Sequence, residues 1–385
     1  MLIPSKNLRR FVSKFIKQPF YAMDVAGKRL KAYQAYYLSK GKSAVPESIT
    51  FFLTHRCNLR CKMCGQWGES GVTKTKSPEI IKEELSFSQL QRVVIDVAKF
   101  KPSITLFGGE PLLYPQIIEL IQEIKQNKMH CLMITNGSLL SNTAEKIAST
   151  GLDELNISLD GGAKLHNEIR GLPGIFEKIA QGIKEINKYK KLNRTKKPLI
   201  NLQCTITKYN YEHLDQLIDA ANELEADSLT YHNLIFLTPE LMQKQKVFDA
   251  ELNCSSCNWE GFIFEPELDP DKLYKNVDKI LSGKHNFSVD FYPNLTKTGL
   301  KEYYNNPNYL PKEYPRRCLS PWIVAYLFPD GEVRPCLNLS YSFGNIKEKP
   351  FQEVWNSKEA LNYRRILKKQ SIFPACIRCT ELYRY

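Results

Sequence analysis

Residues 57–64 read Cys57-Asn58-Leu59-Arg60-Cys61-Lys62-Met63-Cys64 and directly follow an apolar run at residues 49–53. A loop this short can bring three thiolates around one inorganic cluster, whereas a four-iron cluster normally takes four cysteine ligands. One iron would then lack a protein ligand, and an open metal position can bind and activate a small molecule. A zinc site without a nearby fourth ligand, or part of a disulfide framework, are the alternatives.

Around this loop, strand-like runs alternate with helix-period segments, giving six strand-helix alternations. The expected strands are 49–54, 103–107, 130–135, 154–159, 198–207 and 228–233, and the expected helices are 88–100, 115–127, 142–149, 174–190 and 211–224. This alternation predicts right-handed crossovers and a parallel sheet, either open or curled into a partial barrel. Loops that bind ligands would then lie at the carboxyl ends of the strands.

Polar motifs follow these strands at that end. Gly108-Gly109-Glu110 follows the second strand, where glycines let the backbone approach a ligand and a carboxylate can accept hydrogen bonds from an ammonium group. Asn136 ends the third strand. Ser158 and Asp160 share one face of the fourth strand, where they could bind ribose hydroxyls, although Asp160 could instead cap a turn.

The spacing C-x3-C-x2-C, together with Gly108-Gly109-Glu110, resembles the signature of the radical S-adenosylmethionine (SAM) enzymes. The resemblance implies that Cys57, Cys61 and Cys64 hold a [4Fe-4S] cluster whose fourth iron binds SAM. It also implies SAM contacts from Gly108, Gly109, Glu110, Asn136, Ser158 and Asp160, with Arg170 pairing with the SAM carboxylate. Met63 stands where an aromatic residue is usual, which puts its contact with adenine in question.

A second set of cysteines lies near the end of the chain. Cys318 and Cys336 flank a predicted hairpin with Gly331 at its turn, and Cys376 and Cys379 form a C-x2-C pair. Four thiolates could wrap zinc or a four-iron cluster. The pattern resembles the SPASM or shorter twitch domain of radical SAM enzymes, which implies an auxiliary [4Fe-4S] cluster for electron transfer.

We therefore expect an α/β protein with a partial (β/α)6 TIM-like barrel, an N-terminal helical extension and a small C-terminal α+β domain. The expected boundaries are 1–47 for the basic extension, 48–235 for the barrel, 236–310 for a bridging segment or insertion, and 311–385 for the auxiliary cluster domain. In the bridging segment, Cys254 and Cys257 could be a redox pair, extra metal ligands, a hydrogen-atom donor or a plain structural pair.

Charge is unevenly placed along the 385 residues, whose formal net charge is +13. Residues 1–45 hold ten Lys or Arg and one acidic residue, so nine of these charges lie there. The pattern at residues 4–40 predicts a basic amphipathic helix, interrupted at Pro19, that could pack on its own domain, lie on an anionic membrane or bind an acidic peptide.

No apolar run is long enough to span a membrane, and the N-terminus lacks the apolar core of a signal peptide, so we expect a cytoplasmic enzyme. Its eleven cysteines then favour metal binding over disulfides. We expect an electron donor such as flavodoxin or ferredoxin, and no nucleic acid. The substrate could be a small molecule, a lipid or lipid-linked anion, or an acidic precursor peptide. A non-catalytic iron-sulfur or zinc scaffold is the alternative from another class.

Overall fold

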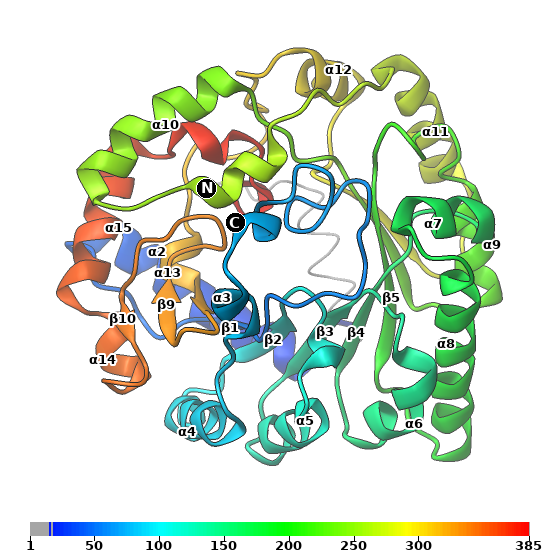
Figure 1. Cartoon of the computed structure of the whole chain (residues 1–385), viewed down its shortest axis with the longest axis horizontal. Helices are drawn as coiled ribbons and strands as arrows, with labels where there is room; N and C mark the ends of the chain where they lie inside the picture. The colour runs from blue at the N-terminus through cyan, green and yellow to red at the C-terminus, as the bar shows by residue number, and fades with distance from the viewer. Residues whose placement is uncertain (1–14, 17, 385) are drawn as a thin grey trace.

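The computed structural model describes residues 15, 16 and 18–384, and its centre is one ten-stranded sheet (Figure 1). The strand order is β10-β9-β8-β1-β2-β3-β4-β5-β6-β7. The strands are β1 (Ser48–Phe52), β2 (Ser103–Phe107), β3 (Cys131–Thr135), β4 (Glu154–Ser158), β5 (Leu199–Thr205), β6 (Ser228–His232), β7 (Ser288–Tyr292), β8 (Val324–Leu327), β9 (Glu332–Arg334) and β10 (Gly344–Asn345).

Strands β1 to β7 pair in parallel and in chain order, which makes the expected partial barrel. In β5, fully buried Ile200, Leu202 and Cys204 alternate with half-buried residues that include Gln203 and Thr205. Because successive side chains of a strand point to opposite faces, one face packs on the helices and the other faces the barrel interior. The interior face of β5 is therefore polar at its carboxyl end.

Helices cover the outer face of this curved sheet (Figure 1). A Ser86–Gln89 capping box starts α4, and Asp269 caps α11 just before Pro270, so local sequence sets both starts. The helices are α2 (Pro19–Leu38), α3 (Pro78–Lys82), α4 (Phe87–Val97), α5 (Ile117–Gln126), α6 (Leu140–Ser149), α7 (Ala163–Arg170), α8 (Ile175–Leu192), α9 (Gln216–Glu223), α10 (Pro239–Leu252), α11 (Pro270–Ser282), α12 (Lys297–Asn305), α13 (Ser320–Ile323), α14 (Phe351–Trp355) and α15 (Lys358–Gln370), with the 3-10 helices η1 (Val72–Thr75), η2 (Pro111–Leu113), η3 (Cys257–Phe262), η4 (Pro374–Arg378) and η5 (Thr380–Tyr383).

The C-terminal part continues the same sheet. Strand β8 pairs in parallel with β1, and the predicted hairpin joins it to antiparallel β9. Phe52 and Phe328 stack across this junction with ring centroids 5.2 Å apart. Residues 351–370 form two helices, α14 and α15, because Ser357 caps α15 through its hydroxyl.

Residues 236–310, expected as a bridging segment or insertion, form regular elements. They contain α10, η3, α11 and α12, and β7 pairs with β6 as a seventh parallel strand. The short run Ser288–Tyr292 carries a charged Asp290 and so lacks the continuous apolar pattern of a buried parallel strand. One sheet runs through three of the four expected segments, so the strand pairing does not separate these segments from one another. The domain boundaries remain a prediction.

At the N-terminus, α2 begins at Pro19 and buries Ala22, Lys28, Ala32 and Tyr36 against the rest of the chain. Most of the amphipathic stretch predicted before Pro19 lies outside the described residues. Within the described part, no helix is long and apolar enough to cross a membrane.

Candidate functional site

The first cysteine loop leaves the end of β1, and each of its sulfurs accepts one hydrogen bond from a different part of the chain. Asn136 Nδ2 lies 3.8 Å from Cys57 Sγ, and Arg170 Nη1 lies 3.7 Å from Cys61 Sγ. The backbone N–H of Trp67 donates to Cys64 Sγ at 3.3 Å. The sulfurs of Cys57 and Cys61 therefore face side chains that follow β3 and end α7, which are the loops that the sequence placed around SAM.

Burial makes the thiols of Cys57 and Cys61 hard to ionise in the absence of a cation. It raises the pKa of Cys57 to about 11 and raises the pKa of Cys61, whose increase is opposed by the Arg170 guanidinium. Iron binds thiolates, so these cysteines must lose their thiol protons when a cluster binds. The positive charge of the iron ions then compensates for the burial of negatively charged sulfurs. Three thiols on one loop, with Cys57 and Cys64 half-buried, fit a cluster that keeps one iron accessible.

Arg170 ends α7 and forms a buried network beside this loop. Its Nη2 pairs with Asp160 Oδ2 at 2.6 Å, and Asp160 Oδ1 accepts from the backbone N–H of Thr205 at 3.1 Å. His166 Nδ1 accepts from the backbone N–H of Asp160 at 3.1 Å. Both carboxylate oxygens of Asp160 are thus engaged within the protein, so its contact with SAM remains a prediction. Arg170 Nε is buried and has no hydrogen-bond partner among the described residues.

The Gly108-Gly109-Glu110 turn packs against the entry of the cysteine loop. A Cβ at Gly109 would lie 2.2 Å from the Arg56 carbonyl oxygen, so glycine is needed here for the protein's own packing. Glu110 is fully buried and accepts hydrogen bonds from Thr135 Oγ1 at 2.6 Å and from Asn136 N at 2.7 Å. The hydrogen bonds of Glu110 connect the turn after β2 to the end of β3. Ligand contacts from the residues of this turn remain predictions.

Other predicted SAM-contact residues border the barrel interior. Ser158 ends β4 on the half-buried face, and Met63 is half-buried within the cysteine loop. Asn136 also donates to Asn58 Oδ1 at 3.1 Å, which ties the β3 loop to the cysteine loop. These side chains lie at the carboxyl ends of neighbouring strands, as the fold requires for ligand loops.

The four C-terminal cysteines come together in space. Cys318 precedes α13, Cys336 follows β9, Cys376 lies in η4 and Cys379 follows it. All four line one cavity of about 210 Å³. In the described residues, no three His, Cys, Asp or Glu side chains converge on a single ion. Four thiols spread around a cavity fit a polynuclear cluster better than one tetrahedral zinc.

These thiols also raise one another's pKa. Burial raises the pKa of Cys336 to about 11 and that of Cys376 to about 12, and neighbouring sulfurs add to the shift in Cys376. Burial and then the sulfur of Cys376 raise the pKa of Cys318 well above its usual value. Thiolates buried close together repel one another. A cluster would place positive iron ions between them and offset this repulsion.

The Cys254–Cys257 segment bridges the two cysteine sites. Gly261 in η3 packs so tightly on the chain next to Cys64 that a Cβ would lie 2.1 Å from the Gly65 carbonyl oxygen. Asn258 Nδ2 donates to the Leu337 carbonyl, next to Cys336, at 3.1 Å. Cys254 is half-buried and Cys257 is exposed, and neither lines the cavity. Their role remains a prediction, and the structure shows a positioning segment around them.

The cavity extends from the four thiols to the barrel. His55 and Gln66, on either side of the cysteine loop, line it, as does Phe107 at the end of β2. Lys76, just after η1, lines it too. Sequence reasoning missed His55 and Lys76, because neither stands in a motif and the cavity forms only when β8 pairs with β1.

Comparison with known proteins matches both halves of this arrangement. Residues 51–235 match the radical SAM superfamily, and residues 318–380 match the iron-sulfur cluster-binding domain SPASM. The chain is 28% identical over 337 residues to the AdoMet-dependent heme synthase of Methanosarcina barkeri, covering 87% of this chain and 88% of that protein. It is 26% identical over 351 residues to the tungsten-containing aldehyde ferredoxin oxidoreductase cofactor-modifying protein of Pyrococcus furiosus, covering 85% of each.

Among solved structures, Streptococcus suis SuiB bound to precursor peptide SuiA is similar, with a TM-score of 0.60 and 18% identity. The likeness covers 86% of this chain and 70% of that chain and concerns the fold alone.

Proposed function

The chain belongs to the radical SAM superfamily and carries a SPASM domain, and from this premise we propose that it catalyses a net two-electron oxidation of a substrate in the cavity between its two cysteine sites. SAM and [4Fe-4S] clusters are its cofactors, and it is an enzyme rather than a scaffold. The observation that carries the proposal is the shared cavity, which is lined both by residues around the first cysteine loop and by all four C-terminal thiols.

When bound, SAM and the first cluster supply a 5'-deoxyadenosyl radical that removes a hydrogen atom, and the second cluster supplies an electron acceptor. Cys57, Cys61 and Cys64 would hold the first cluster, and Cys318, Cys336, Cys376 and Cys379 the second. Arg170 keeps a positive charge beside Cys61 and favours its thiolate. The aromatic walls of the cavity exclude water, which protects a reactive intermediate from side reactions.

For the SAM contacts, we keep the assignment of Gly108, Gly109, Glu110, Asn136, Ser158, Asp160, Arg170 and Met63. Arg170 has the clearest physical basis, because its buried Nε has no partner in the described part of the chain. Asp160 would then act mainly by positioning Arg170, since an ion pair at 2.6 Å fixes the guanidinium.

A small-molecule substrate suits a cavity of about 210 Å³ best, and relatives of similar length include a protein named as a heme synthase. A peptide is the second candidate, because the SuiB neighbour was solved with its precursor peptide. The lipid or lipid-linked substrate and the membrane contact through residues 1–45 draw no support from these relatives. The cytoplasmic location and the flavodoxin or ferredoxin donor remain predictions.

The test is an electron balance on anaerobically reconstituted protein. We expect reductive formation of 5'-deoxyadenosine, and with substrate we expect one reduced auxiliary cluster per product, measured by electron paramagnetic resonance. A product at the same oxidation level as the substrate, with no reduction of the second cluster, would contradict net oxidation.

A further inference from the structure

Lys76 places a charged group on the cavity wall without a protein partner. It is half-buried and follows η1, and within the described residues its ammonium lies near Cys257, Arg334 and Asp330 without a hydrogen bond or ion pair to any of them. Burial lowers its pKa. A half-buried ammonium has lost part of its hydration, and a bound anion would compensate for that loss. An unpartnered ammonium on a cavity wall is therefore suited to an anionic ligand.

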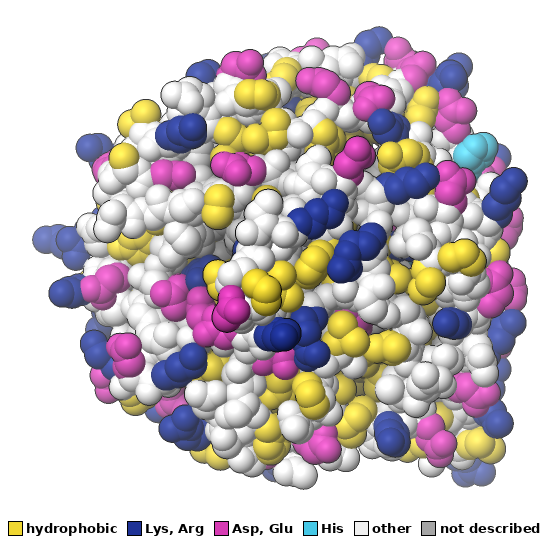
Figure 2. Space-filling model, in the orientation of Figure 1, with side chains coloured by type: hydrophobic (Ala, Val, Ile, Leu, Met, Phe, Trp, Pro, Cys, Tyr) yellow, Lys and Arg dark blue, Asp and Glu magenta, His cyan; other side chains and the backbone are white. Residues whose placement is uncertain are grey.

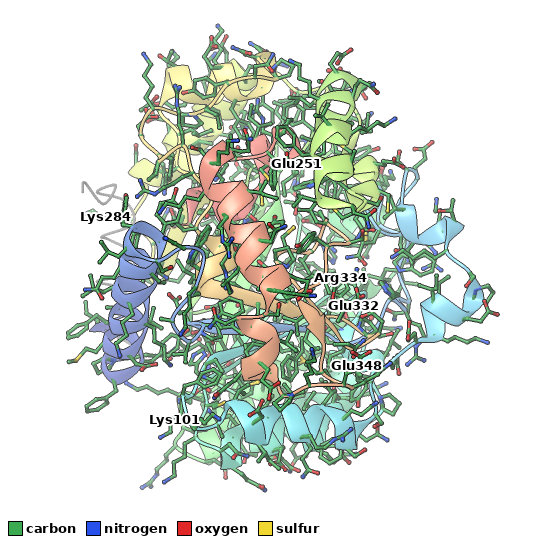
Figure 3. All side chains as sticks on the ribbon, turned by 90° about the vertical axis from the view of Figure 1, so that its left-hand side faces the viewer. Lys101, Glu251, Lys284, Glu332, Arg334 and Glu348 are labelled. Atoms are coloured by element: carbon green, nitrogen blue, oxygen red, sulfur yellow. The ribbon has the colours of Figure 1, made fainter. Side chains whose placement is uncertain are left out.

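The charged groups near Lys76 are already engaged. Arg334 pairs with Asp330 at 2.6 Å and with Glu332 at 2.8 Å, and its guanidinium lies 4.1 Å from the centre of the Phe328 ring. Figure 3 shows the Arg334 and Glu332 side chains together beside α15. Asp330, the carboxylate whose charge acts on Lys76, thus binds Arg334.

The rest of the cavity supplies little competing charge. His55 lines the same wall, and its imidazole can donate or accept a hydrogen bond. Apart from the four thiols, Glu381 is the other described lining residue with a formal charge, and its carboxylate lies 3.5 Å from Ser320 Oγ and 3.2 Å from Arg384 Nη1. Lys76 is therefore the one cationic side chain among the described residues that line the cavity.

Aromatic side chains make up the walls around it. Phe52 and Phe328 stack at 5.2 Å, and Trp259 and Phe262 meet edge to face at 5.6 Å. All four, with Phe107, line the cavity. Surfaces of this kind bind flat, apolar groups through burial and ring contacts. Basic and hydrophobic side chains also lie together over the centre of this face of the molecule (Figure 2).

We propose that Lys76 binds a carboxylate of the substrate while the aromatic walls hold an apolar body, so that the substrate is a small, largely apolar carboxylic acid. This inference rests on the proposed function of the same cavity and adds its substrate class. The ammonium of Lys76 donates to the carboxylate, and His55 lines the same cavity. The carboxylate at Lys76 fixes one end of the substrate, and the body lies between the first cysteine loop and the four thiols.

A matched pair of probes tests this without knowledge of the natural substrate. 1-Naphthylacetate and its neutral analogue 1-naphthylacetamide are titrated into the reconstituted full-length protein, and binding is followed by naphthalene fluorescence anisotropy. We expect the acid to bind about 10-fold more tightly than the amide, because a charge-assisted hydrogen bond forms in a partly desolvated site. Lys76→Met should abolish the preference, and Lys76→Arg should retain most of it.

Lys82→Met is the matched control, since Lys82 is an exposed lysine of α3 with the same charge. It should bind both probes as the unmodified protein does. Equal binding of acid and amide, or an unchanged preference in Lys76→Met, would overturn the proposal. Binding of an acidic peptide through Lys76 with no binding of the small acid would overturn the small-molecule class.

Iron content and formation of 5'-deoxyadenosine are measured on the same samples. They report on the clusters and SAM cleavage, so a failure of the proposed oxidation is distinguishable from a failure of the anion site. Lys82→Met should leave both unchanged, and circular dichroism and the iron content of Lys76→Met show whether that variant is folded.

Discussion

The two cysteine sites differ in how the chain assembles them. The first takes three thiols from one eight-residue loop, and its surroundings are a polar network from α7 and the β3 loop. The second takes four thiols from several separate segments of the C-terminal part, and they close around a cavity. Three ligands leave an iron open for a small molecule, whereas four ligands make a saturated centre suited to electron transfer. The number of protein ligands therefore distinguishes a site that can bind and activate a small molecule from a site that transfers electrons.

The largest effect should follow from removing a ligand of the open site. Cys61→Ala should abolish 5'-deoxyadenosine formation and lower the iron content by about four atoms, because a cluster with two protein ligands is not retained. Product analysis and iron counting under anaerobic conditions measure both. Cys257→Ala, an exposed thiol outside either set, should change neither. SAM cleavage that persists in Cys61→Ala would place the reactive cluster elsewhere.

The second site should fail differently. Cys376→Ala should also lose about four irons but should keep SAM cleavage with a chemical reductant, because the reactive site is intact. Substrate oxidation should be lost. Cys254→Ala is the informative control. Cys336 lies near enough to Cys254 to raise the pKa of the Cys254 thiol, but Cys254 does not line the cavity. If Cys254→Ala loses iron, Cys254 is a ligand and the four-thiol assignment is incomplete.

Sequence reasoning reached these two sites to different depths. The loop of residues 57–64 is local, so its spacing, together with Gly108-Gly109-Glu110, indicates three ligands of one centre. The C-terminal cysteines could be grouped by spacing, but the cavity they share with His55 and Lys76 depends on β8 pairing with β1, over 270 residues away in the chain. Long-range pairing has no local signal, and a single lysine in a loop has none either.

The network beside the first loop shows the same limit. Asp160 and Arg170 were both singled out as ligand residues, yet their pairing with each other was not foreseen. The turn between β4 and α7 folds the end of the helix back over the strand, which no periodic pattern reveals. The packing role of Gly109 is likewise absent from the sequence pattern. A glycine in a turn indicates backbone freedom, and the structure is needed to show which atoms occupy the space beside it.

A smaller effect should distinguish support from ligand binding at this network. Arg170→Met leaves the Asp160 carboxylate buried without its counter-charge and should lower the free energy of unfolding by about 3–5 kcal/mol. The double variant with Asp160→Asn should recover much of this stability, because the amide can still accept from Thr205 N. Denaturant unfolding of samples with equal iron content measures it. If the double variant also regains SAM affinity, Arg170 acts only through packing.

The smallest effect is a pH dependence, and it separates the polar network from the thiol-lined cavity. Burial, and then Arg170, lower the pKa of His166 to about 2, whereas an unfolded histidine titrates near 6.5. Below pH 6.5 His166 is protonated in the unfolded chain but stays neutral in the folded chain, so stability falls as the pH falls. Each pH unit between 6.5 and the lower value costs about 1.4 kcal/mol from this residue.

We therefore expect the unmodified protein to lose about 2 kcal/mol more than His166→Gln between pH 6.5 and 5, measured by urea unfolding at both values. The glutamine oxygen can still accept from the backbone N–H of Asp160, so the variant removes the titration and keeps the contact. An equal loss in both proteins would mean that His166 is protonated in the folded state, and that the Arg170 side of the first site is wetter than its burial indicates.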